Sequence, residues 1–240
     1  MDELIKTINS HANPEKAKIL TRFFKTGKGQ YGEGDRFLGI IVPIQRKIAK
    51  QFTHITLNDV LLLLKNPIHE YRLIALFILI DQYKKGSIEE KKAIFDLYME
   101  NTKYINNWDL IDLSAPQIIG EHLQDRHYTT LITFAKSHSL WKKRIAMLSL
   151  FADIKRERFD RALTIAVILI NDPHDLIQKA VGWMLREIGK RNGLSEEEKF
   201  LNKYVSTMPR TMLRYAIERF PEEKRLYYLN FKNELEHFIP

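Results

Sequence analysis

The sequence contains no cysteine. This absence excludes a disulfide framework, a thiolate metal site and a thiol nucleophile, and it fits a reducing compartment. Long hydrophobic runs are also missing, since the longest, such as residues 73–80, are too short to span a bilayer. The N-terminal residues are acidic and lack the apolar segment of a signal peptide. We therefore expect a soluble cytoplasmic protein without a membrane partner.

Common catalytic motifs are missing as well. The eight histidines are scattered without the spacing of a zinc site, and neither a nucleophile elbow nor a nucleotide fingerprint occurs. Asp109 and Asp112 are too few carboxylates to indicate a metal-dependent nuclease. The sequence predicts neither a metal nor a cofactor.

A basic excess is present. Lys and Arg number 38 against 30 Asp and Glu, which gives a net charge of +8. Such a charge attracts polyanions such as nucleic acid or anionic lipid. Because the basic residues are dispersed, the charge alone also fits a protein without a polyanionic partner.

Apolar residues recur at spacings of three and four along most of the chain, which predicts an all-α fold. Helix starts are indicated where a capping side chain precedes proline, at residues 13–14, 66–67 and 172–173. Residues 56–59 and 195–198 resemble capping boxes.

One segment does not have a helical pattern. Residues 25–40 hold five of the ten glycines, so we expect a loop or a short β-hairpin near residues 26–37. Its Lys28 and Arg36 are candidates for contact with a phosphate backbone, although a solvated loop would carry them equally well.

A weak repeat runs through the helical pattern. Similar segments follow one another at intervals of 35 or 36 residues, and the residues that they align are Arg72, Trp108, Arg144, Lys179 and Arg214. Helix pairs at this period are typical of an α-solenoid. We therefore expect a single domain over residues 1–240, built of HEAT-like helix pairs around a concave basic groove. The alternative is that the long cationic side chains only cover helix seams.

Trp108 and Asp112 lie four residues apart and so share one face of the expected helix. Either the tryptophan packs in the core beside a capping or ion-paired carboxylate, or the pair forms a site. Trp183 stands one turn from Lys179 in the same way. Asp109 is expected at the surface or as a cap.

Several motifs resemble those of one family, the HEAT-like repeat DNA glycosylases of the DNA alkylation repair (AlkD-like) type. The matching segments extend over nearly the whole chain: 37–46, 107–116, 141–148, 178–190 and 208–220. The resemblance implies that Trp108 and Asp112 are the catalytic pair. It further implies that Arg144 is a groove arginine and Trp183 a second site tryptophan.

The implied activity is hydrolysis of the N-glycosidic bond of cationic N3- or N7-alkylated purines in duplex DNA. The resemblance implies DNA repair by a monomer that associates with the nucleoid, with Arg144, Lys179, Arg72 and Arg214 on the phosphates. The glycine-rich segment is longer than in the family's best-known glycosylases. A second hypothesis is therefore a non-catalytic relative that binds branched or distorted DNA, and a third is a protein–protein scaffold, which the repeated cations do not favour.

Overall fold

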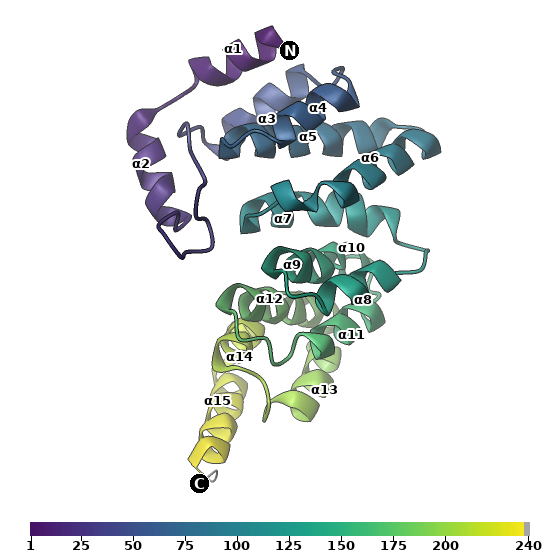
Figure 1. Cartoon of the computed structure of the whole chain (residues 1–240). Helices are drawn as coiled ribbons and strands as arrows, with labels where there is room; N and C mark the ends of the chain where they lie inside the picture. The colour runs from purple at the N-terminus through teal and green to yellow at the C-terminus, as the bar shows by residue number, and fades with distance from the viewer. Residues whose placement is uncertain (238–240) are drawn as a thin grey trace. The chain divides into compact units, whose positions relative to one another are not determined.

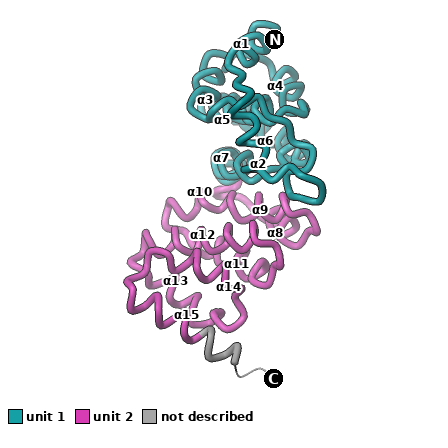
Figure 2. Tube along the Cα trace, turned by 90° about the vertical axis from the view of Figure 1, so that its left-hand side faces the viewer, with its two compact units in different colours: residues 1–122 teal, residues 123–240 magenta. Residues whose placement is uncertain are grey.

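The structure is a computed structural model that describes the chain from Met1 to His237, and its side chains as far as Phe231. Throughout this part of the chain the regular elements are helices, as the sequence predicts (Figure 1). Two compact units are present, residues 1–122 and 123–240 (Figure 2). The expectation of one repeat domain over residues 1–240 stays a prediction.

The first unit contains seven α-helices, a 3-10 turn and a π-helical turn among its described residues. In chain order these are α1 (Asp2–Ser10), α2 (Pro14–Phe23), α3 (Val42–Gln51), α4 (Leu57–Leu64), α5 (His69–Lys85), α6 (Ile88–Glu100), η1 (Thr102–Tyr104), α7 (Trp108–Ala115) and η2 (Pro116–Gly120).

Helix α5 is the centre of this unit. Residues 69–80 are buried without interruption, because α3, α4, α6 and α7 all pack against this helix. A helix that is apolar on all sides must be covered on all sides. The run at 73–80 is therefore a core helix, and the polar residues that open α5 lie inside the unit.

The second unit is arranged around α12, which is buried on only part of its surface. Its elements are α8 (Thr129–Ala135), α9 (Leu140–Ser149), α10 (Phe151–Ile154), α11 (Asp160–Ile168), α12 (Asp175–Asn192), α13 (Ser195–Tyr204), α14 (Arg210–Ala216), η3 (Ile217–Arg219) and α15 (Glu222–His237). Helices α9, α13 and α14 pack on α12, and none of the described helices in either unit is long and apolar enough to cross a membrane.

The predicted helix starts are confirmed in part. Asn13 caps α2 with Pro14 as its first residue, and Thr56 caps α4. The starts at residues 66–67 and 172–173 are wrong by two residues. Asn66 and Asp172 accept instead from the backbone N–H two residues later, in turns that precede α5 and α12. The predicted capping box at 195–198 is also wrong, because α13 begins at residue 195 itself.

The glycine-rich segment is a folded loop, so of the two alternatives expected near residues 26–37 the loop is confirmed and the β-hairpin is not formed. Successive turns join its residues, for example from the N–H of Gln30 to the carbonyl of Gly27. Its β-type pairing is a single bridge between Arg36 and Ile68, just before α5. The loop therefore returns to the body of the first unit instead of projecting as a ribbon.

Candidate functional site

Helix α7 places Trp108 and Asp112 one turn apart, as the sequence predicts. Asn107 is fully buried and caps the helix, where its side chain accepts from the N–H of Trp108 at 2.8 Å. Four residues after Asp112 comes Pro116, which has no N–H to donate to the Asp112 carbonyl, and the helix widens there into a π-helical turn. Both candidate side chains are partly exposed.

The glycine-rich loop and the end of α2 pack around the indole of Trp108. Phe24 stacks on it with ring centres 5.1 Å apart and planes at 26°, and Phe23 approaches edge-on at 5.8 Å. The indole N–H donates to the Tyr31 hydroxyl at 3.3 Å. One face and the N–H edge of the tryptophan are thus in contact with residues from another part of the unit.

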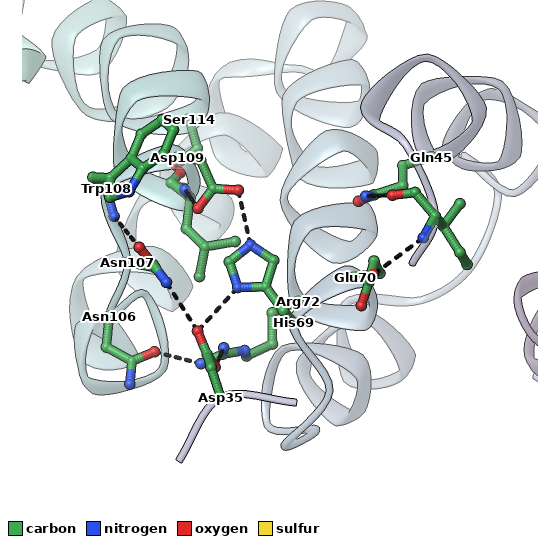
Figure 3. A network of polar contacts seen from close by, with 12 residues as sticks. Asp35, Gln45, His69, Glu70, Arg72, Asn106, Asn107, Trp108, Asp109 and Ser114 are labelled. Atoms are coloured by element: carbon green, nitrogen blue, oxygen red, sulfur yellow. Dashed lines mark hydrogen bonds and ion pairs between the residues drawn. The ribbon is translucent and has the colours of Figure 1, made fainter. Parts of the chain in front are cut away.

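Beneath this aromatic cluster lies a buried ionic network (Figure 3). His69, at the start of α5, contacts Asp35 of the loop through Nδ1 at 3.1 Å and Asp109 of α7 through Nε2 at 2.8 Å. Asp35 also accepts from Arg72 and from Asn107, the latter at 3.0 Å. Two carboxylates and two cations therefore connect three segments that are far apart in the sequence.

His69 and Asp35 keep their charges. Burial alone would lower the pKa of His69, but the charges and hydrogen bonds of Asp109 and Asp35 outweigh it and raise the pKa to about 9. Burial would likewise raise the pKa of Asp35, yet the bond from His69 and the charge of Arg72 hold it below its usual value. At neutral pH the imidazolium is thus paired with the Asp35 carboxylate.

Two sequence expectations change here. Asp109 is buried rather than at the surface, and it bonds to His69 as well as to the N–H of Leu110. Arg72 does not line an exposed groove, because its side chain is only 6% exposed. Its guanidinium, expected to bind a phosphate, is committed instead to Asp35, Asn106 and the carbonyl of Tyr104.

Asp112 is close enough to Tyr98 of α6 for its charge to act on that phenol. The buried Tyr98 of α6 bonds to Ser114 at 2.9 Å, and its pKa is raised by burial and also by the charge of Asp112. The phenol near the Asp112 carboxylate thus stays protonated.

The register of the repeat also changes. The four cations of the alignment occupy the fourth or fifth position of their helices: Arg72 in α5, Arg144 in α9, Lys179 in α12 and Arg214 in α14. In α7 the fifth position is Asp112, whereas Trp108 is the first residue. An offset of one turn exceeds the usual uncertainty of helix ends. The residue of α7 that corresponds to the cations is therefore the carboxylate.

In the second unit, Arg144 is also buried, at 5% exposure, and donates to the carbonyl of Leu176 at 2.6 Å. This departs from the expected exposed groove. Lys179 is partly exposed and pairs with Asp175, while Arg214 is exposed. Of the cations aligned in this unit, Arg214 and Lys179 are therefore more accessible than Arg144.

Trp183 is partly exposed on α12 and lies 5.9 Å from the Phe151 ring. Its side chain bonds to Glu187, which pairs in turn with Arg191 at 2.7 Å. This tryptophan thus resembles Trp108 in having both an aromatic neighbour and a polar partner.

The loop cations Lys28 and Arg36 have exposed side chains, so both are accessible to a ligand.

The sequence analysis did not identify His69 and Glu70, two buried titratable residues at the start of α5. A signal was present, because charged residues directly before a fully apolar run are buried with it and need partners. Over the described residues, no three His, Asp or Glu side chains are grouped to hold a metal ion.

Comparisons with known proteins agree with this fold. A family model described as DNA alkylation repair enzyme matches residues 4–220. A solved structure described as "Predicted DNA alkylation repair enzyme from Enterococcus faecalis" is 19% identical, with a TM-score of 0.67 over 88% of this chain and 98% of that chain. Comparison with curated proteins gave no match. At this identity the structural likeness concerns the fold.

Proposed function

Because the chain belongs to the family of DNA alkylation repair enzymes, we propose that it is a glycosylase that hydrolyses the N-glycosidic bond of cationic N3- or N7-alkylated purines in duplex DNA. The observation that carries the proposal is the placing of Trp108 and Asp112. Both are partly exposed on adjacent turns of α7, and the first turn of that helix is fixed by Asn107 and Asp109.

The chemistry suits a single carboxylate. An N3- or N7-alkylated purine already carries positive charge, so it leaves without a general acid. As the bond breaks, positive charge develops on the deoxyribose, and the Asp112 carboxylate would stabilise it and orient the attacking water. Trp108 would contact the sugar or the cationic base through its exposed surface, a cation–π contact that contributes about 0.5 to 2 kcal/mol.

The second unit would supply further contacts to DNA. We assign Trp183 as a second aromatic contact, and Lys179 and Arg214 as phosphate contacts, on the strength of their accessible side chains. Lys28 and Arg36 would act similarly from the loop. Each phosphate contact makes affinity fall as salt rises. Arg144 would act indirectly, because its guanidinium fixes α9 against α12 through the carbonyl of Leu176.

The test is release of N7-methylguanine and N3-methyladenine from methylated duplex DNA. We expect release by the wild-type protein and a loss of at least about 100-fold in the single-turnover rate with Asp112→Asn, as when electrostatic stabilisation of a transition state is removed. DNA affinity should change little. The matched control is Asp96→Asn, which alters an exposed carboxylate of α6 that pairs with Lys92.

Absence of release by the wild-type protein would reject the glycosylase. If the same protein then bound three- or four-way junctions more tightly than duplex DNA, the non-catalytic DNA-binding function would replace it. Absence of DNA binding at low ionic strength would reject both functions and leave the scaffold.

A further inference from the structure

Glu70 of α5 binds the C-terminal end of the glycine-rich loop through hydrogen bonds. This carboxylate is fully buried and accepts from the N–H groups of Leu38 at 3.0 Å, Gly39 at 2.8 Å and Ile40 at 3.2 Å. Gly39 has a φ of +85°, and a Cβ there would lie 2.1 Å from the carbonyl oxygen of Asn13. The loop therefore ends with its backbone bonded to the Glu70 side chain of α5 and close to the backbone at the start of α2.

The N-terminal end of the loop is folded against Trp108. The N–H of Gly32 donates to the carbonyl of Lys25 at 3.2 Å, which closes the loop on itself. A Cβ at Gly32 would lie 2.3 Å from the Phe24 carbonyl, so this approach needs glycine. The closed loop brings the Tyr31 hydroxyl to the indole N–H and leaves Phe24 stacked on the ring.

Asp35 connects the glycine-rich loop to α7, the helix that bears the candidate site. It is four residues beyond Tyr31, and its carboxylate accepts from the amide of Asn107, the cap of α7. Through His69 it also connects to Asp109 in the first turn of that helix. The same loop thus contacts the tryptophan ring at Tyr31 and the backbone start of its helix at Asp35.

We propose that Tyr31 and Asp35 are positioning residues, through which the glycine-rich loop sets the orientation of the Trp108 indole and of the first turn of α7. The contacts of the loop occupy one ring face and the N–H edge, so the rest of the ring is presented in one fixed orientation. For its effect on catalysis this inference rests on the proposed glycosylase function.

The first test is spectroscopic and needs no DNA. The protein has three tryptophans, so a spectrum of ¹⁵N-labelled protein shows three indole N–H signals, and Trp108→Phe identifies that of residue 108. We expect Tyr31→Phe to shift the Trp108 indole signal and to speed its exchange with solvent, and to leave the Trp141 and Trp183 signals in place. Tyr104→Phe, the same change elsewhere in the first unit, should not speed the exchange of the Trp108 indole.

The second test is kinetic. Loss of one neutral hydrogen bond to the ring should lower the single-turnover rate of base release about fivefold, with DNA affinity unchanged within twofold. Asp35→Asn, which keeps the shape of the side chain but weakens its bonds to His69 and Arg72, should also shift the Trp108 indole signal.

The outcomes separate the two proposals. An unshifted Trp108 indole signal in Tyr31→Phe overturns the positioning role, whatever the activity. A shifted signal in a protein that releases no base supports the positioning of Trp108 while the glycosylase function fails. Equal losses of affinity and rate in Tyr31→Phe would make the loop a DNA-binding element and also overturn the proposal.

Discussion

His69 of α5 and Asp109 of α7 are joined by an ion pair of 2.8 Å from which solvent is almost excluded. A buried pair of this kind adds little net stability compared with apolar packing, but removing one partner leaves an uncompensated buried charge. Its main effect is to fix α7 to α5. The candidate site therefore depends on residues that never touch the substrate.

Stability should fall in mildly alkaline solution because of His69. Its pKa is about 9 in the folded chain against about 6.5 when unfolded. Between these two pH values the folded chain therefore keeps a proton that the unfolded chain has lost. The stabilisation is complete below about pH 6.5 and is lost as pH rises through 9, with a total of about 3 kcal/mol. Urea unfolding of the wild type and of His69→Gln between pH 6 and 9.5 measures it, as the change with pH in the difference between the two proteins.

His69→Gln should be less stable than the wild type at pH 6, and the difference should shrink towards pH 9.5. The control is His54→Gln, an exposed residue of the same unit, which should leave the pH profile as it is. A wild-type stability that stays level between pH 6 and 9.5 would contradict the assignment of a charged His69.

Arg72 and Arg214 should respond differently to the same substitution. Arg72→Met leaves Asp35 without its buried guanidinium, so the free energy of unfolding should fall by about 3 kcal/mol. Arg214→Met changes an exposed side chain, so stability should hold, while the slope of log affinity against log salt falls by about one. Thermal unfolding and DNA titrations at several salt concentrations distinguish the two. A reduced salt slope for a fully folded Arg72→Met would restore that arginine to the DNA-binding surface.

Gly39→Ala should destabilise the protein more than Gly29→Ala. Both glycines have positive φ, which costs alanine about 1 kcal/mol at either position. At Gly39 the new Cβ would also lie 2.1 Å from the Asn13 carbonyl oxygen, whereas it meets nothing within 4 Å at Gly29. The difference in free energy of unfolding between the two variants, measured by chemical unfolding, gives the cost of the close contact. Equal losses of stability would show that the loop end can move away from Asn13.

Glu197→Gln should stabilise the protein at pH 8. Burial raises the pKa of Glu197 to about 9, against the opposing charge of Arg186, and Oε1 has no hydrogen-bond partner among the described residues. Because the folded chain holds the extra proton, wild-type stability falls as pH rises from about 4.5 to about 9. The glutamine does not titrate, so its advantage should grow over that interval. Urea unfolding at pH 5 and pH 8 tests this, and a variant less stable than the wild type at pH 8 would refute it.

The sequence was sufficient for features that depend on short spacing. The all-α fold and the shared face of Trp108 and Asp112 follow from residues three and four apart, whose geometry any helix fixes. The spacing of 36 residues places Trp108 at the aligned position, whereas Asp112 has the corresponding place in its helix, because spacing along the sequence does not fix where α7 begins.

Features that depend on distant pairs could not be predicted in this way. His69 and Asp109 are 40 residues apart and Asp35 and Asn107 are 72 apart, with no periodicity that links them. The burial of Arg72 depends on one of these residues, its ion-pair partner Asp35. Arg72 is buried beside a carboxylate and Arg214 is at the surface, yet both follow the same local sequence pattern. Only the fold distinguishes them.

Glu70 binds the loop through backbone N–H groups alone, and this bears on how the segment can be redesigned. Side chains at residues 38 and 40 contribute nothing to those three bonds. The bonds therefore tolerate a change of the partly exposed Leu38 as long as the backbone can still turn at Gly39, whereas Ile40 is buried in the core. Between Phe24 and Asp35 the chain is bounded by two fixed points on the same unit. A loop grafted into that stretch must therefore keep Tyr31 and Gly32, because these two residues make the contact with Trp108 and allow the close approach to Phe24.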